Sequence, residues 1–321
     1  MSRNHVDHNT IAVFAQDKVN LPKVKADEYR AQARRLREKL EDYLKDHPSF
    51  SLRKMMISGS LAKGTALRSL NDIDVACYVS GVDAPSDISE LLEYIAEKLR
   101  KAFPNFSPDQ VKPQTYSISV SFKGSGLDVD IVPILYYEDK DWYGNLVSQD
   151  DGSFLETNIP FHLEFIRKRK QVRPENFSQV VRLAKFWARK EKRERNNFRF
   201  KSFMIEMILS KLCDQGMVFS DYPEALQGFF TYIATSNIRE LIVFDDYYNS
   251  NKVKPITTPI KIIDPVNAEN NVGNLYTKEQ ADMIVDAALD AGDAIDAALS
   301  AITKQDTVYY WQKVFGPTFQ A

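Results

Sequence analysis

Hydrophobic residues follow two different spacings along this chain of 321 residues. In much of the first half they alternate with polar residues, which is the pattern of a strand with one buried face. Alternating or short apolar runs predict strands at residues 55–58, 72–79, 116–122 and 127–132. The Gly124-Ser125-Gly126 segment between the last two strands predicts a β-hairpin.

Helical spacing marks the other predicted elements. A charged helix is expected to begin after Lys25-Ala26-Asp27 and to end before Pro48, because the residue before a proline disfavours the helical conformation. Ser86 is expected to cap a second helix, whereas residues 1–23 are polar and predicted to be irregular. A capping box at Thr277-Lys278-Glu279-Gln280 predicts the start of a further helix.

After Pro160 the helical pattern continues nearly to the end of the chain. We therefore expect two domains, a mixed α/β core at residues 1–160 and a helical domain at residues 161–321. The predicted fold class is α+β. The sequence shows no internal repeat or low-complexity tract that would point to a repeat architecture.

The composition narrows the function classes. With 44% hydrophobic residues the chain can bury a large core, and a net charge of −2 argues against a general polyanion-binding protein. Cys77 and Cys213 are too few for a cysteine-rich zinc site or a disulfide scaffold, so both are predicted to be buried, reduced thiols. The sequence has no signal peptide, transmembrane run or lipidation motif, so we expect a cytoplasmic protein without a membrane partner.

The most informative polar residues lie in Ser58-Gly59-Ser60-Leu61-Ala62-Lys63 and in Asn71-Asp72-Ile73-Asp74-Val75. Strand alternation places Asp72 and Asp74 on one face, where two carboxylates repel each other unless a cation holds them. Carboxylate oxygens suit Mg²⁺, with Mn²⁺ as an alternative. The turn that begins at Gly59 offers backbone N–H groups, the Ser60 hydroxyl and Lys63 to a phosphate. A phosphate-binding turn beside a divalent-metal pair indicates nucleotidyl transfer.

A third carboxylate is expected on the next strand of the hairpin, where Asp128 and Asp130 alternate with apolar residues. Strand alternation leaves both residues open. Val129-Asp130-Ile131-Val132 resembles the third-aspartate strand of the DNA polymerase β-like nucleotidyltransferases, and this resemblance favours Asp130 as the ligand, with Asp128 as the alternative. Asp72, Asp74 and Asp130 would then hold two Mg²⁺ ions, one for the nucleotide triphosphate and one for the attacking ribose hydroxyl. Displacement at the α-phosphate would release pyrophosphate, and positioning with charge neutralisation would supply most of the catalysis.

These segments resemble known families. Gly59-Ser60 followed by Asp72-Ile73-Asp74-Val75 resembles the signature of the DNA polymerase β-like nucleotidyltransferases. Leu183-Ala184-Lys185-Phe186-Trp187 resembles the Leu-Lys-x-Trp helix of the 2′-5′-oligoadenylate synthetases, with Ala184 as an additional residue. This resemblance implies that Lys185 contacts the triphosphate and that Ser202, at the start of the next helix, lies at the same phosphate site.

Two further segments carry weaker signals. Asp264-Pro265 with Asn270-Asn271-Val272 resembles another segment of the same synthetases, and we expect it to form a turn that packs near the base pocket. Residues 167–201 are rich in Lys and Arg, which allows a surface stripe where nucleic acid could bind as a regulator.

The whole chain resembles the bacterial CD-NTases, and most of all clade C of that family. The resemblance rests on His5-Val6-Asp7-His8, on residues 59–68, on Phe198-Arg199-Phe200-Lys201-Ser202 and on Tyr310-Trp311-Gln312-Lys313-Val314-Phe315-Gly316. It implies a polymerase β-like nucleotidyltransferase core with an oligoadenylate synthetase-like helical domain, and synthesis of a cyclic oligonucleotide, cyclic triadenylate, from ATP. It also implies a CBASS anti-phage system with a HORMA-domain activator, an AAA+ ATPase regulator and a nuclease effector.

Three alternatives stay open on the sequence. A linear nucleotide-adding enzyme of the poly(A) or CCA type would share the aspartates. A catalytically silent binding module is disfavoured by the intact Ser60, Asp72 and Asp74, and a toxin-type transferase by the large helical second half. Base selectivity, ring size and linkage depend on a few contacts in the pocket, which the sequence does not fix.

Overall fold

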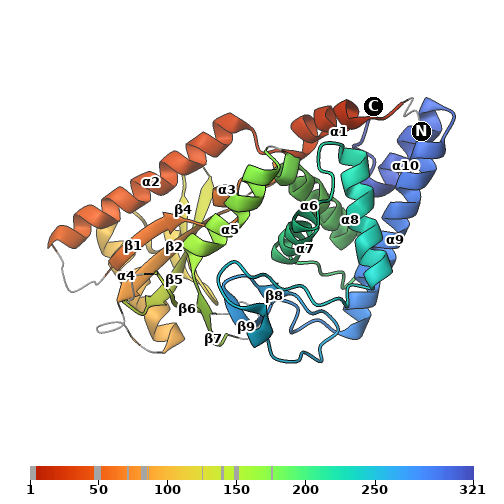
Figure 1. Cartoon of the computed structure of the whole chain (residues 1–321). Helices are drawn as coiled ribbons and strands as arrows, with labels where there is room; N and C mark the ends of the chain where they lie inside the picture. Colours follow the sequence, from red (N-terminus) through yellow and green to blue (C-terminus); the bar gives the residue numbers. More distant parts are fainter. Residues whose placement is uncertain are drawn as a thin grey trace. The chain divides into compact units, whose positions relative to one another are not determined.

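A computed structural model describes residues 5–46, 52–70, 72–80, 85, 87–124, 126–138, 141–147, 152–174 and 176–321. The chain divides into two compact units, Leu21–Leu163 and a second unit made of Met1–Asn20 with Glu164–Ala321. The first unit is built on a sheet and the second is mainly helical (Figure 1). The predicted domains, 1–160 and 161–321, differ from these units in where the N-terminal segment lies.

The Leu21–Leu163 unit contains one mixed sheet, whose paired strands follow the order β1-β2-β5-β4-β3, with β6 paired to β5 and β7 to β6. β2 and β5 are parallel, and the other pairs in this sheet are antiparallel. The elements are α2 (Lys23–Asp46), β1 (Leu52–Ile57), α3 (Gly59–Lys63), β2 (Asp72–Ser80), α4 (Ile88–Ala102), β3 (Val111–Pro113), β4 (Ile118–Phe122), β5 (Leu127–Tyr136), β6 (Gly144–Val147) and β7 (Phe154–Thr157). A 3₁₀ turn at Pro108–Gln110 precedes β3.

One face of this sheet forms the core of the unit. Ile73 and Val75 on β2 and Val129 and Ile131 on β5 are buried there together with apolar residues of α2 and α4. Strand alternation explains the arrangement, because residues of one parity face the core and residues of the other parity face away. The alternation therefore leaves the second face of β2 and β5 for the aspartates. The predicted strands and the α+β fold class are confirmed.

The predicted cap of α4 is wrong. Asp87 is the N-cap residue, and its side chain accepts hydrogen bonds from the backbone N–H groups of Ser89 and Glu90. Ser86 lies outside the described residues. A carboxylate one position later serves the exposed N–H groups of the helix equally well, so the two caps could not be told apart from sequence.

The helical unit contains α1 (His8–Phe14), a π-helix (Ala15–Val19), α6 (Asn176–Glu194), α7 (Ser202–Asp214), α8 (Tyr222–Ser236), a 3₁₀ turn (Ser250–Lys252), β8 (Ile263–Asp264), β9 (Asn267–Asn271), α9 (Lys278–Ser300) and α10 (Lys304–Phe315). α5 (Ile159–Val172) crosses from the first unit into this one. α9 runs between α8 and α10 and packs against both (Figure 1). Thr277 caps α9 through the predicted capping box.

The expectation of an irregular N-terminus is wrong for residues 8–19, which are helical. Asp7 caps α1, and the Phe14 ring lies 5.1 Å from the Phe315 ring and 4.9 Å from the Phe319 ring, measured between centroids. Ile11, Phe14, Ala15 and Val19 are buried, whereas Val13 is exposed. A short segment can be helical without a long amphipathic pattern when tertiary packing supplies the stabilisation.

The expected continuous helical pattern is also wrong between Ser236 and Lys278. Instead of a helix, this segment contains the 3₁₀ turn and the β8–β9 hairpin. The Asp264-Pro265 turn is confirmed, since the buried Asp264 side chain accepts hydrogen bonds from Val266 N–H at 2.9 Å and from Asn270 Nδ2 at 3.1 Å. The bond from Val266 satisfies a backbone N–H group of the turn, and the bond from Asn270 ties the turn to β9 through a side chain.

Both cysteines are free and buried, as predicted. Burial raises the pKa of the Cys77 thiol to about 12 and raises the pKa of Cys213 as well. Because the thiolate is the reactive form, we expect iodoacetamide to leave both residues unmodified in the native protein and to alkylate both in urea. Intact-mass measurement checks this, and fast native labelling of Cys77 would contradict its place in the core.

Among the described residues, no helix is both long and apolar enough to cross a membrane.

Candidate active site

The aspartates lie on the face of the sheet that points away from the α2–α4 core. On β2, Asp72 and Asp74 have the opposite parity to the buried Ile73 and Val75. On β5, the same alternation puts the side chains of Asp128 and Asp130 on one face. The sequence predicted both pairs, but it did not predict that β2 and β5 are neighbours.

The parallel pairing of β2 with β5 aligns the two carboxylate pairs. Asp72 is opposite Asp128, and Asp74 is opposite Asp130. Asp72 and Asp128 are exposed, whereas Asp74 and Asp130 are half-buried. Neighbouring strands lie about 4.8 Å apart, so the carboxylates of each aligned pair are close neighbours. Four carboxylates are thus collected on two adjacent strands.

The electrostatics of this cluster favour a cation. Burial raises the pKa of Asp130, and the negative charge of Asp72 raises it further, with a smaller contribution from Asp128. A hydrogen bond from Ser119 acts in the opposite direction. Like-charge repulsion of this kind is relieved when a divalent ion binds the group. The donor set of carboxylate oxygens fits Mg²⁺ or Mn²⁺ in its chemistry.

The carboxylates are not arranged as a complete metal site. Among the residues that the structure describes, no group of three or more His, Cys, Asp and Glu side chains could hold a metal ion as it stands. The assignment of Asp72, Asp74 and Asp130 as metal ligands therefore stays a prediction. What the structure provides is their common face and their register.

The predicted phosphate turn is in contact with β2. Gly59 begins α3 with a φ angle of +59°, and the Ser58 N–H donates to the Asp74 carbonyl at 2.8 Å. A Cβ atom on Gly59 would lie 1.8 Å from Asp74 Oδ2, so the Asp74 carboxylate packs directly against the glycine backbone. Ser60 and Lys63 are half-buried residues of the same short helix. The structure thus places Gly59, Ser60 and Lys63 in one turn, and that turn is in contact with Asp74.

Lys185 and Ser202 belong to the helical unit. Lys185 lies on α6 and is 5% exposed, and its Nζ donates to Glu206 Oε1 on α7 at 3.0 Å. Ser202 is the exposed first residue of α7, after the cap residue Lys201. The Lys201 N–H donates to the Tyr276 hydroxyl at 3.0 Å, which ties the start of α7 to the segment that follows the β8–β9 hairpin.

The predicted basic stripe is interrupted by internal ion pairs. Arg169 is buried between Asp214 and Asp246, with distances of 2.6 and 2.8 Å. Lys185 and Lys190 are also buried and paired with glutamates. These side chains hold helices together and do not form a solvent-facing strip.

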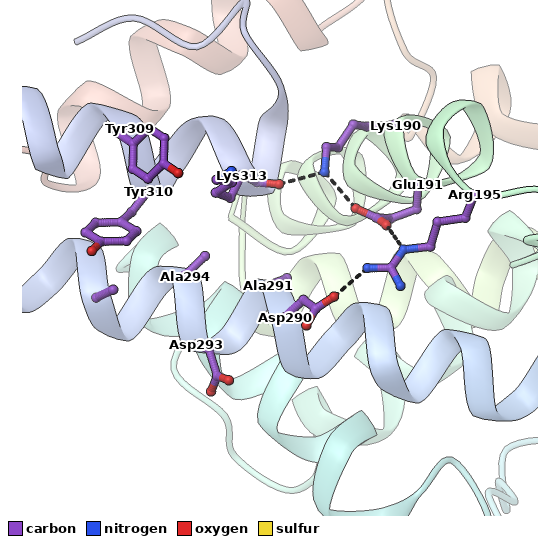
Figure 2. A pocket seen from close by; sticks show the side chains of 11 residues that line it. Lys190, Glu191, Arg195, Asp290, Ala291, Asp293, Ala294, Tyr309, Tyr310 and Lys313 are labelled. Carbon is purple, nitrogen blue, oxygen red and sulfur yellow. Dashed lines mark hydrogen bonds and ion pairs between the residues drawn. The ribbon is translucent and has the colours of Figure 1, made fainter.

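A pocket of about 490 Å³ lies between α6, α9 and α10. Figure 2 shows how its polar groups bind one another. Lys190 donates to Glu191 at 2.9 Å and to the Lys313 carbonyl at 2.7 Å, and Arg195 donates to Glu191 and Asp290 at 2.6 Å each. These hydrogen bonds join the three helices. Because the charged groups of the pocket are hydrogen-bonded to one another, the pocket does not indicate which ligand it would bind.

Sequence reasoning missed three residues at these sites. Ser121 donates to Asp128 at 2.6 Å, and Ser119 forms its hydrogen bond with Asp130 from the neighbouring position on β4. Their alternation with apolar residues was the only available signal. Glu206 stands alone in the apolar sequence Met204-Ile205-Glu206-Met207-Ile208, which indicates a buried acid in need of a partner.

No family model matches the chain. The Bradyrhizobium diazoefficiens CD-NTase CdnG, solved in complex with GTP, matches with a TM-score of 0.67 at 14% identity, over 93% of this chain and 92% of that chain. At this identity the similarity shows the fold alone. The fold is therefore that of the CD-NTases.

Sequence relatives define the family more closely. The cyclic AMP-AMP-AMP synthase of Escherichia coli (strain MS 115-1) is 67% identical over 320 residues, which is 100% of both proteins. The CBASS oligonucleotide cyclase CdnC of E. coli (strain KTE188) is 33% identical over 97% of this chain and 96% of that protein. The chain belongs to the CdnC family of CBASS oligonucleotide cyclases, which are nucleotidyltransferases of the CD-NTase class.

Solved structures of E. coli MS115-1 CdnC agree with this assignment. The structure with ATP matches with a TM-score of 0.96 at 67% identity, over 99% of this chain and 100% of that one. The structure of the complex with HORMA-deltaN matches with a TM-score of 0.95 at 66% identity, over 100% of both chains.

Proposed function

We propose that this chain is a Mg²⁺-dependent enzyme that makes cyclic triadenylate from ATP in a CBASS anti-phage system. The observation that carries the proposal is the register of β2 and β5, which sets Asp74 opposite Asp130 while the Gly59 turn packs against Asp74. The 67% identity to a cyclic AMP-AMP-AMP synthase supports the product.

Asp72, Asp74 and Asp130 are proposed to hold two Mg²⁺ ions, with Mn²⁺ as a substitute. When bound, the ions supply charge neutralisation at the phosphates and lower the pKa of the attacking hydroxyl. The protein orients the ribose hydroxyl of one nucleotide in line with the α-phosphate of another. Gly59, Ser60 and Lys63 hold the leaving phosphates, which depart as pyrophosphate.

The helical unit is proposed to bind the triphosphate through Lys185 and Ser202. α7 is a helix of 13 residues, and its cap residue Lys201 makes no side-chain capping hydrogen bond. The first N–H groups of such a helix favour an anion, and Ser202 adds a hydroxyl there. ATP binding is supported by the solved ATP complex of the similar E. coli MS115-1 CdnC.

The proposed partners are inferred from a solved complex of a similar protein and from the family to which the chain belongs. A HORMA-domain protein is proposed as the activator, since the similar CdnC was solved in a complex with HORMA-deltaN. An AAA+ ATPase is proposed as the regulator of that complex. A regulatory nucleic acid remains a hypothesis for the exposed basic residues of 167–201, and a cytoplasmic location is proposed for the assembly.

The product assay decides between cyclic and linear synthesis. We expect ATP, Mg²⁺ and a HORMA-domain activator to give a phosphatase-resistant cyclic trimer of AMP, identified by nuclease digestion and mass spectrometry. Asp72→Asn is expected to lower the rate by about 10³-fold or more, because it removes a negative metal ligand. A 3′ tail on added RNA, from a poly(A)- or CCA-type activity, would contradict the proposal. So would full activity of Asp72→Asn.

A further inference from the structure

Two charged residues of opposite sign are buried together between α6 and α7. The Lys185 and Glu206 side chains are 6% and 3% exposed, and their Nζ and Oε1 atoms are 3.0 Å apart. Their neighbours along the helices, including Ala184, Ile205 and Met207, are fully buried and apolar. Such a pair pays a large desolvation cost, so a buried apolar pair of similar size would often stabilise the fold as well or better. Fold stability alone therefore does not explain why charges occupy these positions.

The position of Glu206 on α7 links the pair to the phosphate site. Glu206 is four residues after Ser202, so the two lie on one face of the helix, about 6 Å apart along its axis. The hydrogen bond to Glu206 therefore holds the Lys185 ammonium one turn from the N-terminal end of α7. That end is favourable for an anion.

We infer that Glu206 is a positioning residue, which keeps the Lys185 ammonium charged and directed toward the triphosphate of the nucleotide at the start of α7. A lysine has four rotatable side-chain bonds, and a buried ammonium without a nearby anion tends to lose its proton. The hydrogen bond to Glu206 restricts the rotation of the Lys185 side chain, and the Glu206 charge favours the protonated ammonium. This inference rests on the proposed function, in which Lys185 and Ser202 bind the triphosphate.

The chain supplies a matched control on the same helix. Lys190 and Glu191 form a second buried ion pair on α6, with Nζ and Oε1 2.9 Å apart and side-chain exposures of 11% and 4%. Glu191 is also bonded to Arg195, within the self-satisfied network of Figure 2. Lys190 also lies 2.9 Å from Glu194, so it keeps a carboxylate partner when Glu191 is replaced. Glu191→Gln therefore removes a carboxylate from a buried ion pair that has no proposed part in nucleotide binding.

We expect Glu206→Gln to raise the KM for ATP about tenfold and to weaken binding of a non-hydrolysable ATP analogue by a similar factor, with kcat within about threefold of wild type. Glu206→Gln and Glu191→Gln are both expected to lower the melting temperature, and by similar amounts, because each removes a carboxylate from a buried ion pair. Glu191→Gln, however, is expected to leave analogue binding within about twofold of wild type. Equal losses of affinity in the two variants would overturn the inference, as would wild-type affinity of Glu206→Gln.

A double variant tests whether Glu206 acts through Lys185. Lys185→Met with Glu206→Gln is expected to bind the analogue no more weakly than Lys185→Met alone, because the two changes remove one interaction. Additive losses would overturn the inference. If Glu206→Gln does not fold, Glu206→Asp keeps the charge on a shorter side chain and is expected to weaken binding about threefold, and wild-type binding would count against the inference. Analogue binding needs no turnover, so these results are independent of the Asp72→Asn assay, which tests the proposed function.

Discussion

Asp130→Asn is expected to lower the rate of nucleotidyl transfer by about 10³-fold, whereas Asp128→Asn should stay within about fivefold of wild type. Both residues lie on the same face of β5. They differ in their partners across the sheet. Asp130 is half-buried opposite Asp74, and Asp128 is exposed opposite Asp72.

The difference follows from the electrostatics of the two positions. Burial and the charge of Asp72 raise the pKa of Asp130, so a cation gains most by binding there, close to Asp74. Asp128 is exposed to water and accepts a hydrogen bond from Ser121, so its charge is already solvated. Asparagine has nearly the same size as aspartate, so the activities of the two variants report the loss of the negative charge at each position.

Initial rates with saturating ATP and a series of Mg²⁺ concentrations measure both variants. The Asp130 variant should remain folded by circular dichroism and should not recover at high Mg²⁺, because it lacks a ligand charge that more metal does not replace. If Asp128→Asn is the inactive variant, the third ligand is Asp128 and the roles of the two residues are reversed. If both variants are active, the third carboxylate is not on β5.

The face of the sheet that carries the candidate site could be predicted because strand alternation is a local property. The apolar and acidic residues of 72–75 and 128–131 are enough to place each pair of aspartates on one face. The parallel pairing of β2 with β5 could not be predicted, since it joins residues that are 56 positions apart in the sequence, such as Asp72 and Asp128. Long-range pairing is fixed by the packing of the complete core and leaves no local pattern.

The same distinction explains the residues that were missed. The role of Lys185 was suggested by a motif, but its bond to Glu206 joins two helices, and sequence spacing does not give such a contact. The N-terminal helix was missed because its stabilisation comes from Phe14 packing against Phe315 and Phe319 at the other end of the chain. In both cases the decisive interaction is tertiary, whereas the capping box at Thr277 is local and was found.

Gly59→Ala is expected to reduce nucleotidyl transfer by about 10²-fold through displacement of Asp74, a proposed metal ligand. The added Cβ atom would lie 1.8 Å from Asp74 Oδ2 and 2.6 Å from Asp74 Cγ, so the side chain or the turn must move. Either movement separates the phosphate turn from the carboxylate that it contacts. Misplacement of about 1 Å at a reacting centre is sufficient for a loss of this size.

Gly126→Ala provides the matched control for this substitution. Gly126 has a φ angle of +65°, close to the +59° of Gly59, so alanine suffers the same backbone strain at both positions. A Cβ atom on Gly126, however, has no neighbour within 4 Å. Both variants should therefore lose about 1 kcal/mol of unfolding free energy from strain, while the loss of activity should be confined to Gly59→Ala. Equal activities in the two variants, measured with ATP and Mg²⁺ alongside thermal melts, would show that contact between the turn and Asp74 is not needed for catalysis.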